Sequence, residues 1–469
     1  MSAGSEQPGR VATVGGRERA LVVATVLVGS VSTLLAATIV NVAFPALMRE
    51  LRIGHDSAQW VATGFLAATT ATMLAAAWAI ERFGERLTFI AAMVVFAGAS
   101  LLGALARDTT TLIAARVLQG AAAGLVQPLA MVALFRVFPP GERGRAMGLY
   151  GLGIVLAPAV GPAVGGALIE AWSWRAIFVL PIPFAIAAVA LAARALATTR
   201  VAAARRFDTV GALVLVAALV ALLNLPVIGH RAGWLSPLTF ALAIGGAALA
   251  VCFVMWERHT PHGLLRVALF AHRGFTGACL VGFAYGAGLF GTTYLVPVFV
   301  QQVAAFGARD AGLLLAPAGI ALAGAIVVGG RLTDRFPARH LVIAGLVLFA
   351  LSSLLLTRAG NATSFTALAA CIVLGRLGLG LIIPSLNVGA VQALEGPDLA
   401  YASSGVNFVR QLGGAVGVNL LAVLLEWRIA VAPADVASAF HVCFMAVTVA
   451  FLLAVVPARW IGARATTSP

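Results

Sequence analysis

The sequence predicts an all-α, polytopic membrane protein. It should form two six-helix bundles with pseudo-two-fold symmetry plus a two-helix central insert, giving fourteen transmembrane helices. The chain of 469 residues is 61% hydrophobic and only 10% charged, whereas a soluble domain is about 45–50% apolar and about 25% charged. Apolar runs of spanning length, about 20 residues, recur along the chain, and patterns of its first part return in its second. The composition excludes a soluble protein of this length.

The expected spans follow from cutting the chain at its charged loops and at loops that contain Gly, Pro or Asn. The stretch before the first apolar run carries arginines but no small-residue cleavage site, so we expect an uncleaved first span. About fourteen segments are long enough to cross a bilayer. They are residues 21–46, 58–79, 88–106, 111–134, 146–170, 176–194, 209–228, 238–256, 275–299, 311–329, 341–357, 365–390, 406–427 and 438–457.

An internal repeat indicates two related halves. AWAIERFGER (77–86) and GRLTDRFPAR (330–339) share an acid–Arg–Phe pattern, and GLVQP (124–128) matches GLIIP (380–384) at nearly the same offset. Two matches at nearly one offset are typical of transporters built from repeats. The expected parts are a cytoplasmic N-terminal tail 1–20, a six-helix bundle 21–194, a cytoplasmic linker 195–208, the insert 209–256, a cytoplasmic loop 257–274, a six-helix bundle 275–457 and a cytoplasmic C-terminal tail 458–469.

The charge of the chain predicts its orientation. The net charge of +14 reflects 31 arginines set against 17 acidic residues, and the sequence contains no lysine. The arginines are dispersed among short loops, which argues against a nucleic-acid partner. With a cytoplasmic N-terminus, about twenty arginines face the cytoplasm and about eight face outward, as the positive-inside rule requires. We therefore expect cytoplasmic termini in a plasma membrane, and the wealth of Ala, Gly and Arg suggests the inner membrane of a high-GC bacterium.

Six motifs in order give the chain a family resemblance. They are TIVNVAFP (38–45), AWAIERFGER (77–86), LIAARVLQGAAAG (112–124), GIVLAPAVGPAVGG (153–166), WSWRAIF (172–178) and NFVRQLGGAVG (407–417). From about residue 20 to residue 455 the chain resembles the major facilitator superfamily, specifically its fourteen-helix drug:proton antiporter branch. The resemblance implies alternating access around a site near the bilayer midplane.

The stretch 153–166 places helix breakers inside an apolar run. Small residues let another backbone approach closely in a bilayer, and proline removes helix hydrogen bonds and bends a helix. The resemblance implies an antiporter motif that seals the cytoplasmic contact between the halves. The alternative is a crowded membrane helix that collects such residues without a special role. The residues concerned are Gly153, Pro158, Gly161, Pro162, Gly165 and Gly166.

The two repeated loops are candidate gates. A carboxylate at the end of one helix can lie at the positive N-terminus of another, a contact worth about 0.3–2 kcal/mol. Glu81 and Asp334 are the acids expected to do so, although Glu81 replaces the family's usual Asp. The alternative is ordinary loop charge under the positive-inside rule. The gate residues are Glu81, Arg82, Gly84 and Arg86 in the first loop and Asp334, Arg335 and Arg339 in the second.

Arg116 is the most informative candidate of the cavity. It lies about one to two turns inside its span, where a charge costs several kcal/mol unless it faces a cavity or a partner. Gln119 follows one turn later on roughly the same face. The resemblance implies a relay for substrate and proton, and snorkelling to the outer interface is the alternative.

Other polar residues complete the expected cavity. Arg376 is a second intramembrane arginine, but the repeat pairs it with Gly120 rather than Arg116, so it is not given the same role. Arg410 and Gln411 are either relay residues or interface anchors. The remaining candidates are Thr38, Asn41 and Asn407.

One departure from the family concerns the proton. The family's first-helix signature usually carries an Asp three residues before I-V-N, and here that place holds Ala36. A buried carboxylate can bind and release a proton, so the usual coupling site is missing. Glu170 and Glu426 are the deepest other acids, and both read better as interface residues. A cavity of arginines and neutral polar groups favours neutral or anionic amphipathic substrates.

The expected function is therefore export of small amphipathic compounds, such as antibiotics or related metabolites, by proton-coupled antiport. Two alternatives stay open: an uncoupled or anion-exchanging transporter on the same fold, and a transport-inactive membrane protein that senses a ligand. The cysteines and histidines show no metal-ligand spacing and no nucleophile–base pair. We expect no enzyme activity, no cofactor and no metal, and a monomer.

Overall fold

The computed structural model describes residues 15–52, 55–198, 206–260, 263–304, 306, 308–392, 394, 397–433 and 435–462. The expected tails, linker and loop between the bundles fall partly outside these ranges. The side chains of Asn41, Pro158 and Pro162, all expected at functional sites, also lie outside the described part. The backbone at these three positions is helical.

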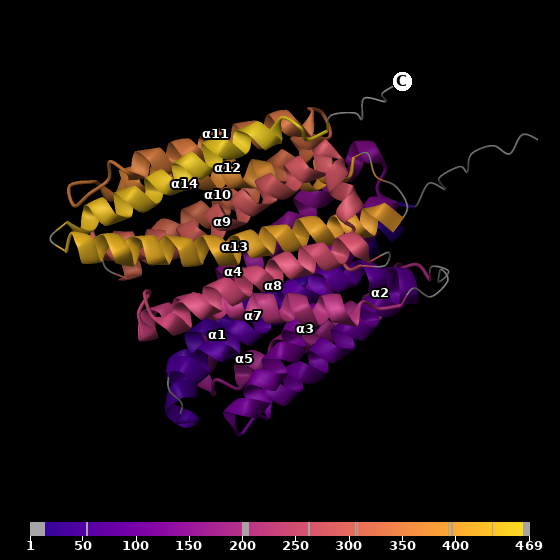
Figure 1. The fold of residues 1–469 in the computed structure, drawn as a ribbon. Coiled ribbons are helices and arrows are strands. Elements are labelled where there is room, and N and C mark those ends of the chain that lie inside the picture. The colour runs from indigo at the N-terminus through magenta and orange to yellow at the C-terminus, as the bar shows by residue number, and fades with distance from the viewer. Residues whose placement is uncertain are drawn as a thin grey trace, which may run out of the picture.

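The described chain is helical throughout, as its composition predicts (Figure 1). The longer helices are apolar and of spanning length, and several begin at a Ser or Asp whose side chain accepts a hydrogen bond from the first turn, for example Asp108 from the Thr111 N–H. The elements are α1 (Gly16–Glu50), α2 (His55–Ala104), α3 (Thr109–Val137), η1 (Pro140–Glu142), α4 (Arg143–Ala171), α5 (Ala176–Val179), α6 (Pro181–Ala195), α7 (Thr209–Ala232), α8 (Pro237–His259), η2 (Val267–Ala271), α9 (Arg273–Gln302), α10 (Ala308–Thr333), α11 (Ala338–Leu356), α12 (Phe365–Val391), α13 (Pro397–Val431) and α14 (Val436–Ala458).

Twelve helices in the described residues are long and apolar enough to cross a membrane. The prediction of a polytopic α-helical membrane protein is thereby confirmed, whereas the count is two fewer than expected. One of the twelve, Trp60–Ala104, covers most of both expected spans 58–79 and 88–106. The expected span 146–170 lies in α4, which is not among the twelve.

Two expected spans meet at a turn in α2. Gly84 has φ 78° and ψ 161° in an otherwise helical run. That backbone conformation favours glycine, because a β-carbon would be strained there. The Thr88 hydroxyl donates to the Ala79 carbonyl at 2.9 Å, so a side chain bridges the two arms of the turn.

The helices form two groups and an insert. Helices α1–α6, the N half, pack on one another, and helices α9–α14, the C half, do the same. The halves meet where α4 packs against α10 and α12, and where α13 packs against α2 and α3. Figure 1 shows α7 and α8, the insert, running between the indigo-purple N half and the orange-yellow C half.

The insert contacts both halves. Leu215 and Leu219 of α7 and Phe253 of α8 share a buried cluster with Leu74 of α2 and Phe408 of α13. The insert therefore packs across the α2–α13 contact rather than on one half alone.

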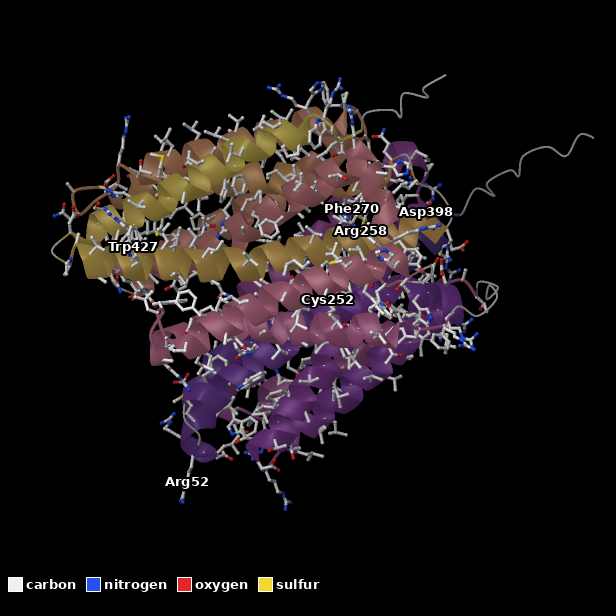
Figure 2. The ribbon with its side chains drawn as sticks, in the orientation of Figure 1. Arg52, Cys252, Arg258, Phe270, Asp398 and Trp427 are labelled. Carbon is white, nitrogen blue, oxygen red and sulfur yellow. The ribbon has the colours of Figure 1, made fainter. Side chains whose placement is uncertain are left out.

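The bundle has two ends, which we name by the course of the chain. The terminal end is where α1 begins and α14 ends, and the far end is opposite. Figure 2 shows Arg258 and Asp398 at the terminal end and Arg52 and Trp427 at the far end.

Candidate functional site

Arg116 is buried where α1, α2 and α3 meet. Its side chain is 1% exposed, and its guanidinium donates to three neutral oxygens: Val61 O at 3.0 Å, Ala36 O at 3.1 Å and Gln119 Oε1 at 3.0 Å. The guanidinium carbon also lies 4.1 Å from the centre of the Phe65 ring. Carbonyl dipoles and an aromatic face stabilise a cation without a counter-charge, and among the described residues no acid pairs with Arg116.

A hydrogen-bond chain extends from Arg116 to the second arm of α2. The Gln119 amide donates to Ser100 Oγ at 2.8 Å, and that hydroxyl donates to Phe96 O at 2.8 Å. The expected placement of Gln119 on the same face as Arg116 is thus seen in the structure. The contact with Ala36 O shows that the position of the missing first-helix acid lies beside the arginine.

Arg410 joins the two halves near the middle of the bundle. Its Nη2 atom donates to Gln127 Oε1 of α3 at 3.0 Å and to Asn407 Oδ1 of its own helix at 2.6 Å. About two turns closer to the terminal end on α13, the Ser403 hydroxyl donates to Pro128 O at 2.9 Å. Arg410 is therefore a contact between the halves rather than an anchor at the interface.

Asp334 closes the α4–α10 contact at the terminal end. Its carboxylate accepts from the Gly144 N–H at 2.7 Å and from the Arg145 N–H at 2.9 Å, in the first turn of α4. The expected position at the N-terminus of another helix is seen in the structure. Burial raises the pKa of Asp334, against the lowering effect of these two N–H donors.

The glycine backbone beside Asp334 brings α4 and α10 close together. A β-carbon at Gly330 would lie 2.4 Å from Gly144 O and 2.7 Å from Gly148 Cα. Because these neighbours are backbone atoms, no side-chain rotation could relieve such an overlap. The pair Gly144 and Gly148 lies one turn apart, so both face α10.

Glu81 closes the α2–α13 contact in a different way. Its carboxylate accepts from the Tyr401 hydroxyl near the start of α13 at 3.1 Å, and the expected contact of this acid with a helix N-terminus stays a prediction. The Tyr401 ring in turn lies 5.8 Å from the Arg266 guanidinium, which is paired with Asp398. Among the described residues, the hydrogen bonds between the halves extend from Arg410 to the terminal end, so this end is closed.

The sequence of the chain matches the profile of a known protein family. The sequence profile described as "Major Facilitator Superfamily" matches residues 26–418 and, in a second alignment, residues 278–469. The chain belongs to the Major Facilitator Superfamily. The first of these matches alone covers most of the chain.

Relatives and a solved structure agree with this assignment. The chain is 31% identical over 427 residues to a methylenomycin A resistance protein of Streptomyces coelicolor, covering 91% of this chain and 88% of the relative. It is 32% identical over 403 residues to a puromycin resistance protein of Streptomyces alboniger, covering 84% and 80%. A human organic anion transporter has the same fold, with a TM-score of 0.69 at 17% identity over 94% of this chain and 99% of that one.

The glycines of the stretch 153–166 pack within the N half, where a β-carbon at each would meet α1. Helix α4 itself lies at the contact between the halves, against α10 and α12, and a β-carbon at Gly151, two residues before the stretch, would lie 2.5 Å from Ile326 of α10. The sealing role of the helix stays a prediction. The nearest neighbours are Leu27 for Gly153, Thr38 for Gly161, Ile39 for Gly165 and Val42 for Gly166.

The other gate residues make weaker contacts. Arg86 Nη1 donates to the Thr198 hydroxyl at 3.4 Å, and the Arg82 guanidinium lies 6.0 Å from the Phe83 ring. Arg335 and Arg339 are exposed. The exposure of Arg335 and Arg339 suits contact with lipid phosphates, whereas Arg82 and Arg86 are half-buried.

The remaining cavity candidates are dispersed. The Thr38 hydroxyl bonds to carbonyls of its own helix, and Gln411 is half-buried beside Arg410 in the chain. Arg376 lies in the C half and donates from Nη2 to the Thr293 hydroxyl at 3.2 Å. Glu170 and Glu426 are exposed, in agreement with an interface position. The structure brings together Arg116 with Gln119, and Arg410 with Asn407, as two separate groups.

Two buried acids were missed in the sequence. Glu85 is 4% exposed and pairs with Arg136 of α3 at 2.8 Å. Glu257 of α8 is 4% exposed and accepts from the Leu264 and Leu265 N–H groups at 3.1 and 2.9 Å. Both lie at helix ends, where the sequence predicts an exposed side chain. Their burial comes from other segments that fold over them, which the sequence does not reveal.

Proposed function

We propose that this member of the superfamily exports small amphipathic compounds by alternating access, driven by proton antiport. The observation that carries the proposal is the closed terminal end. Its contacts are a few hydrogen bonds and a glycine backbone contact, which a rocking motion of two halves can break and remake. The two resistance proteins among the relatives support antibiotics or related metabolites as cargo. The compounds favoured are neutral or anionic, and a monomer suffices.

The fold under this proposal has fourteen transmembrane helices in two six-helix bundles with a central insert. The span Trp60–Ala104 has 45 residues, about 68 Å of helix at 1.5 Å per residue, whereas the hydrocarbon core is about 30 Å thick. With a turn at Gly84, α2 crosses twice. Helix α4 has 29 residues and supplies another crossing. The parts then keep their expected bounds, 21–194, 209–256 and 275–457.

The terminal end is the cytoplasmic end in this proposal. The bias of arginines toward the loops at this end supports that orientation, in a bacterial cytoplasmic membrane. The structure then represents a state closed to the cytoplasm, with Glu81 and Asp334 biasing the gate. Opening requires Asp334 to leave two backbone N–H groups and Tyr401 to leave Glu81.

Arg116 is the proposed relay of the cavity. Its three acceptors are neutral, so an anionic group that approached it would gain attraction without displacing a resident carboxylate. The Gln119–Ser100 chain fixes the orientation of the guanidinium. Arg116 would bind and release a charged group without breaking a covalent bond.

The test uses the full chain reconstituted in vesicles, a panel of dyes and antibiotics, and an imposed pH gradient. We expect uptake into inside-out vesicles that tracks the gradient and falls at least about tenfold in Arg116→Ala, because the cavity loses its cation. Arg358→Ala removes an exposed arginine and serves as the matched control. Flux that ignores the gradient would contradict proton coupling, and binding without flux would favour the ligand-sensing alternative.

An uncoupled or anion-exchanging transporter is the second candidate. It is favoured by the absence, among the described residues, of an acid paired with Arg116. Ala36→Asp would place a carboxylate beside the arginine, since Arg116 Nη1 already contacts Ala36 O. If this substitution created a proton dependence that the natural chain lacks, the second candidate would replace the first.

A further inference from the structure

Arg376 differs from the other buried arginines in how few partners it has. It is 8% exposed, on α12, about 17 Å along the helix from its first residue at 1.5 Å per residue. Within the described part of the chain, its guanidinium makes one hydrogen bond, from Nη2 to the Thr293 hydroxyl at 3.2 Å. A guanidinium carries five N–H donors, so most of those of Arg376 have no protein acceptor.

These donors face a small cavity between α9, α11 and α12. The space has a volume of about 280 Å³, which includes a part open to the surface. Its polar lining consists of Arg376, Thr292, Ser352 and Ser353, and apolar side chains such as Phe349 close the rest. The part enclosed between the helices is of the size of one water molecule or one small ion.

The hydroxyl groups of the cavity leave donors free for an anion. Thr292 donates to Gly288 O at 2.7 Å and Ser352 donates to Cys371 O at 2.6 Å, so both hydrogens are already used. Ser353 is 1% exposed, and its hydroxyl has no hydrogen bond to the described residues. The free hydrogens of Arg376 and Ser353 therefore converge on one space.

The charge of the site favours a negative occupant. A buried cation is costly unless a counter-charge or a set of acceptors compensates it. No acid side chain pairs with Arg376 in the described chain, and the one acceptor is a hydroxyl that itself donates to Leu289 O. Thr293 is exposed on α9, so the guanidinium lies beside a route to the surface.

We propose that Arg376 and Ser353 bind a small monovalent anion, of the size of chloride, in this cavity. The anion neutralises the buried guanidinium and links α12, which carries Arg376, to α11, which carries Ser353. The site is separate from Arg116 and does not depend on the proposed efflux. A substrate carboxylate has the same charge, but the cavity is too small for the rest of an amphipathic molecule.

The test measures thermal unfolding of the purified full chain at constant ionic strength while chloride replaces gluconate. We expect a saturable rise of Tm by about 1–3 °C, because a ligand that binds only the folded state stabilises it. Arg376→Gln should abolish the response. Arg410→Gln is the matched control, since Arg410 is satisfied by Gln127 and Asn407, and it should keep the response.

Ser353→Ala keeps the charge and nearly the volume of the site, and remains informative if Arg376→Gln does not fold. Loss of one donor to an anion should raise the half-saturating chloride concentration about tenfold. Bromide should replace chloride and show anomalous diffraction at Arg376. An unchanged Tm as chloride replaces gluconate, or a chloride response that survives in Arg376→Gln, would overturn the proposal. Protection by a carboxylate compound but not by chloride would overturn it in favour of substrate binding.

Discussion

Arg116 in the N half and Arg376 in the C half are both buried inside spanning helices, at positions that the internal repeat does not pair. Arg116 donates to three oxygens and lies against an aromatic ring. Arg376 donates to one hydroxyl and faces a cavity. The two halves therefore share a helical scaffold but satisfy a buried cation differently. The repeat therefore extends to the order of the helices and to the loop acids, whereas the buried polar residues of the two halves differ.

The two gate acids show the same divergence. Asp334 of the C half binds two N–H groups at the start of α4, whereas Glu81 of the N half accepts from the hydroxyl of Tyr401. One contact uses the backbone and the other a side chain. Substitutions on the two sides should therefore differ in effect.

The largest effect is expected for Arg116→Lys. An ammonium keeps the charge but cannot reach three acceptors on α1, α2 and α3 with the geometry of a guanidinium. We expect transport in vesicles to fall at least about tenfold, with normal folding by circular dichroism. Arg376→Lys, the equivalent change in the other half, should reduce transport much less. Equal losses for both variants would show that the two halves depend on their buried arginines in the same way.

The next effect is expected for Gly330→Ala at the α4–α10 contact. The added methyl group would meet Gly144 O and Gly148 Cα, which costs about 1–3 kcal/mol in the closed state. Gly324→Ala on the same helix is the matched control, because no atom lies within 4 Å of its β-carbon. A cysteine probe at the terminal end should react faster in Gly330→Ala alone. Equal reactivity in both variants would show that this contact does not hold the end closed.

Asp334→Asn should have a smaller effect and Glu81→Gln a smaller one again. The amide oxygen of Asn can accept from one of the two N–H groups, but its NH2 group cannot accept from the other. The charge at the helix N-terminus is also lost, which is worth about 0.3–1 kcal/mol or somewhat more when partly buried. Glu81→Gln keeps an acceptor for the Tyr401 hydroxyl. The reaction rate of the same cysteine probe should rise about two- to tenfold in Asp334→Asn. A larger shift for Glu81→Gln would reverse the order of the two gates.

The smallest effect is expected from an ion pair that stays within one half. At the far end Glu50 pairs with Arg175 and accepts from the Trp174 indole N–H at 2.7 Å. The Arg175 guanidinium, and more weakly the indole, hold the pKa of Glu50 below its ordinary value. A lowered pKa in the folded state means that the stabilisation is present above the ordinary Glu pKa and is lost as the pH falls through the lowered value.

Glu50→Gln should therefore lower Tm slightly at pH 7 and make no difference at a pH below the lowered pKa. Exposed pairs are worth about 0–1 kcal/mol, and this one does not join the halves, so transport should be unchanged. A transport defect in Glu50→Gln would show that the far end also takes part in gating.

Much of the fold followed from the sequence, because apolar runs of spanning length leave few alternatives to helices in a bilayer. The place of Asp334 followed from helix electrostatics, and the contact of Arg116 with Gln119 followed from helical spacing. The gate roles of Glu81 and Asp334 stay predictions. The helix that the glycines of 153–166 contact was not predicted, because a glycine pattern marks a close contact without naming the partner helix. Glu85 and Glu257 were missed because burial at a helix end depends on segments that are distant in sequence.

The insert gives the bilayer a part in the motion of the protein. Leu215 and Leu219 pack on Leu74 and Phe408, one from each half, so a rocking motion must slide or split this cluster. The apolar side chains uncovered in that motion meet lipid tails, which solvate them about as well as protein does. The equilibrium between the two states should then change little with acyl-chain length. The rate of the transport cycle should change more, because lipid must flow in and out beneath α7 at every turnover. Transport rates in vesicles made of lipids with different acyl-chain lengths measure this resistance.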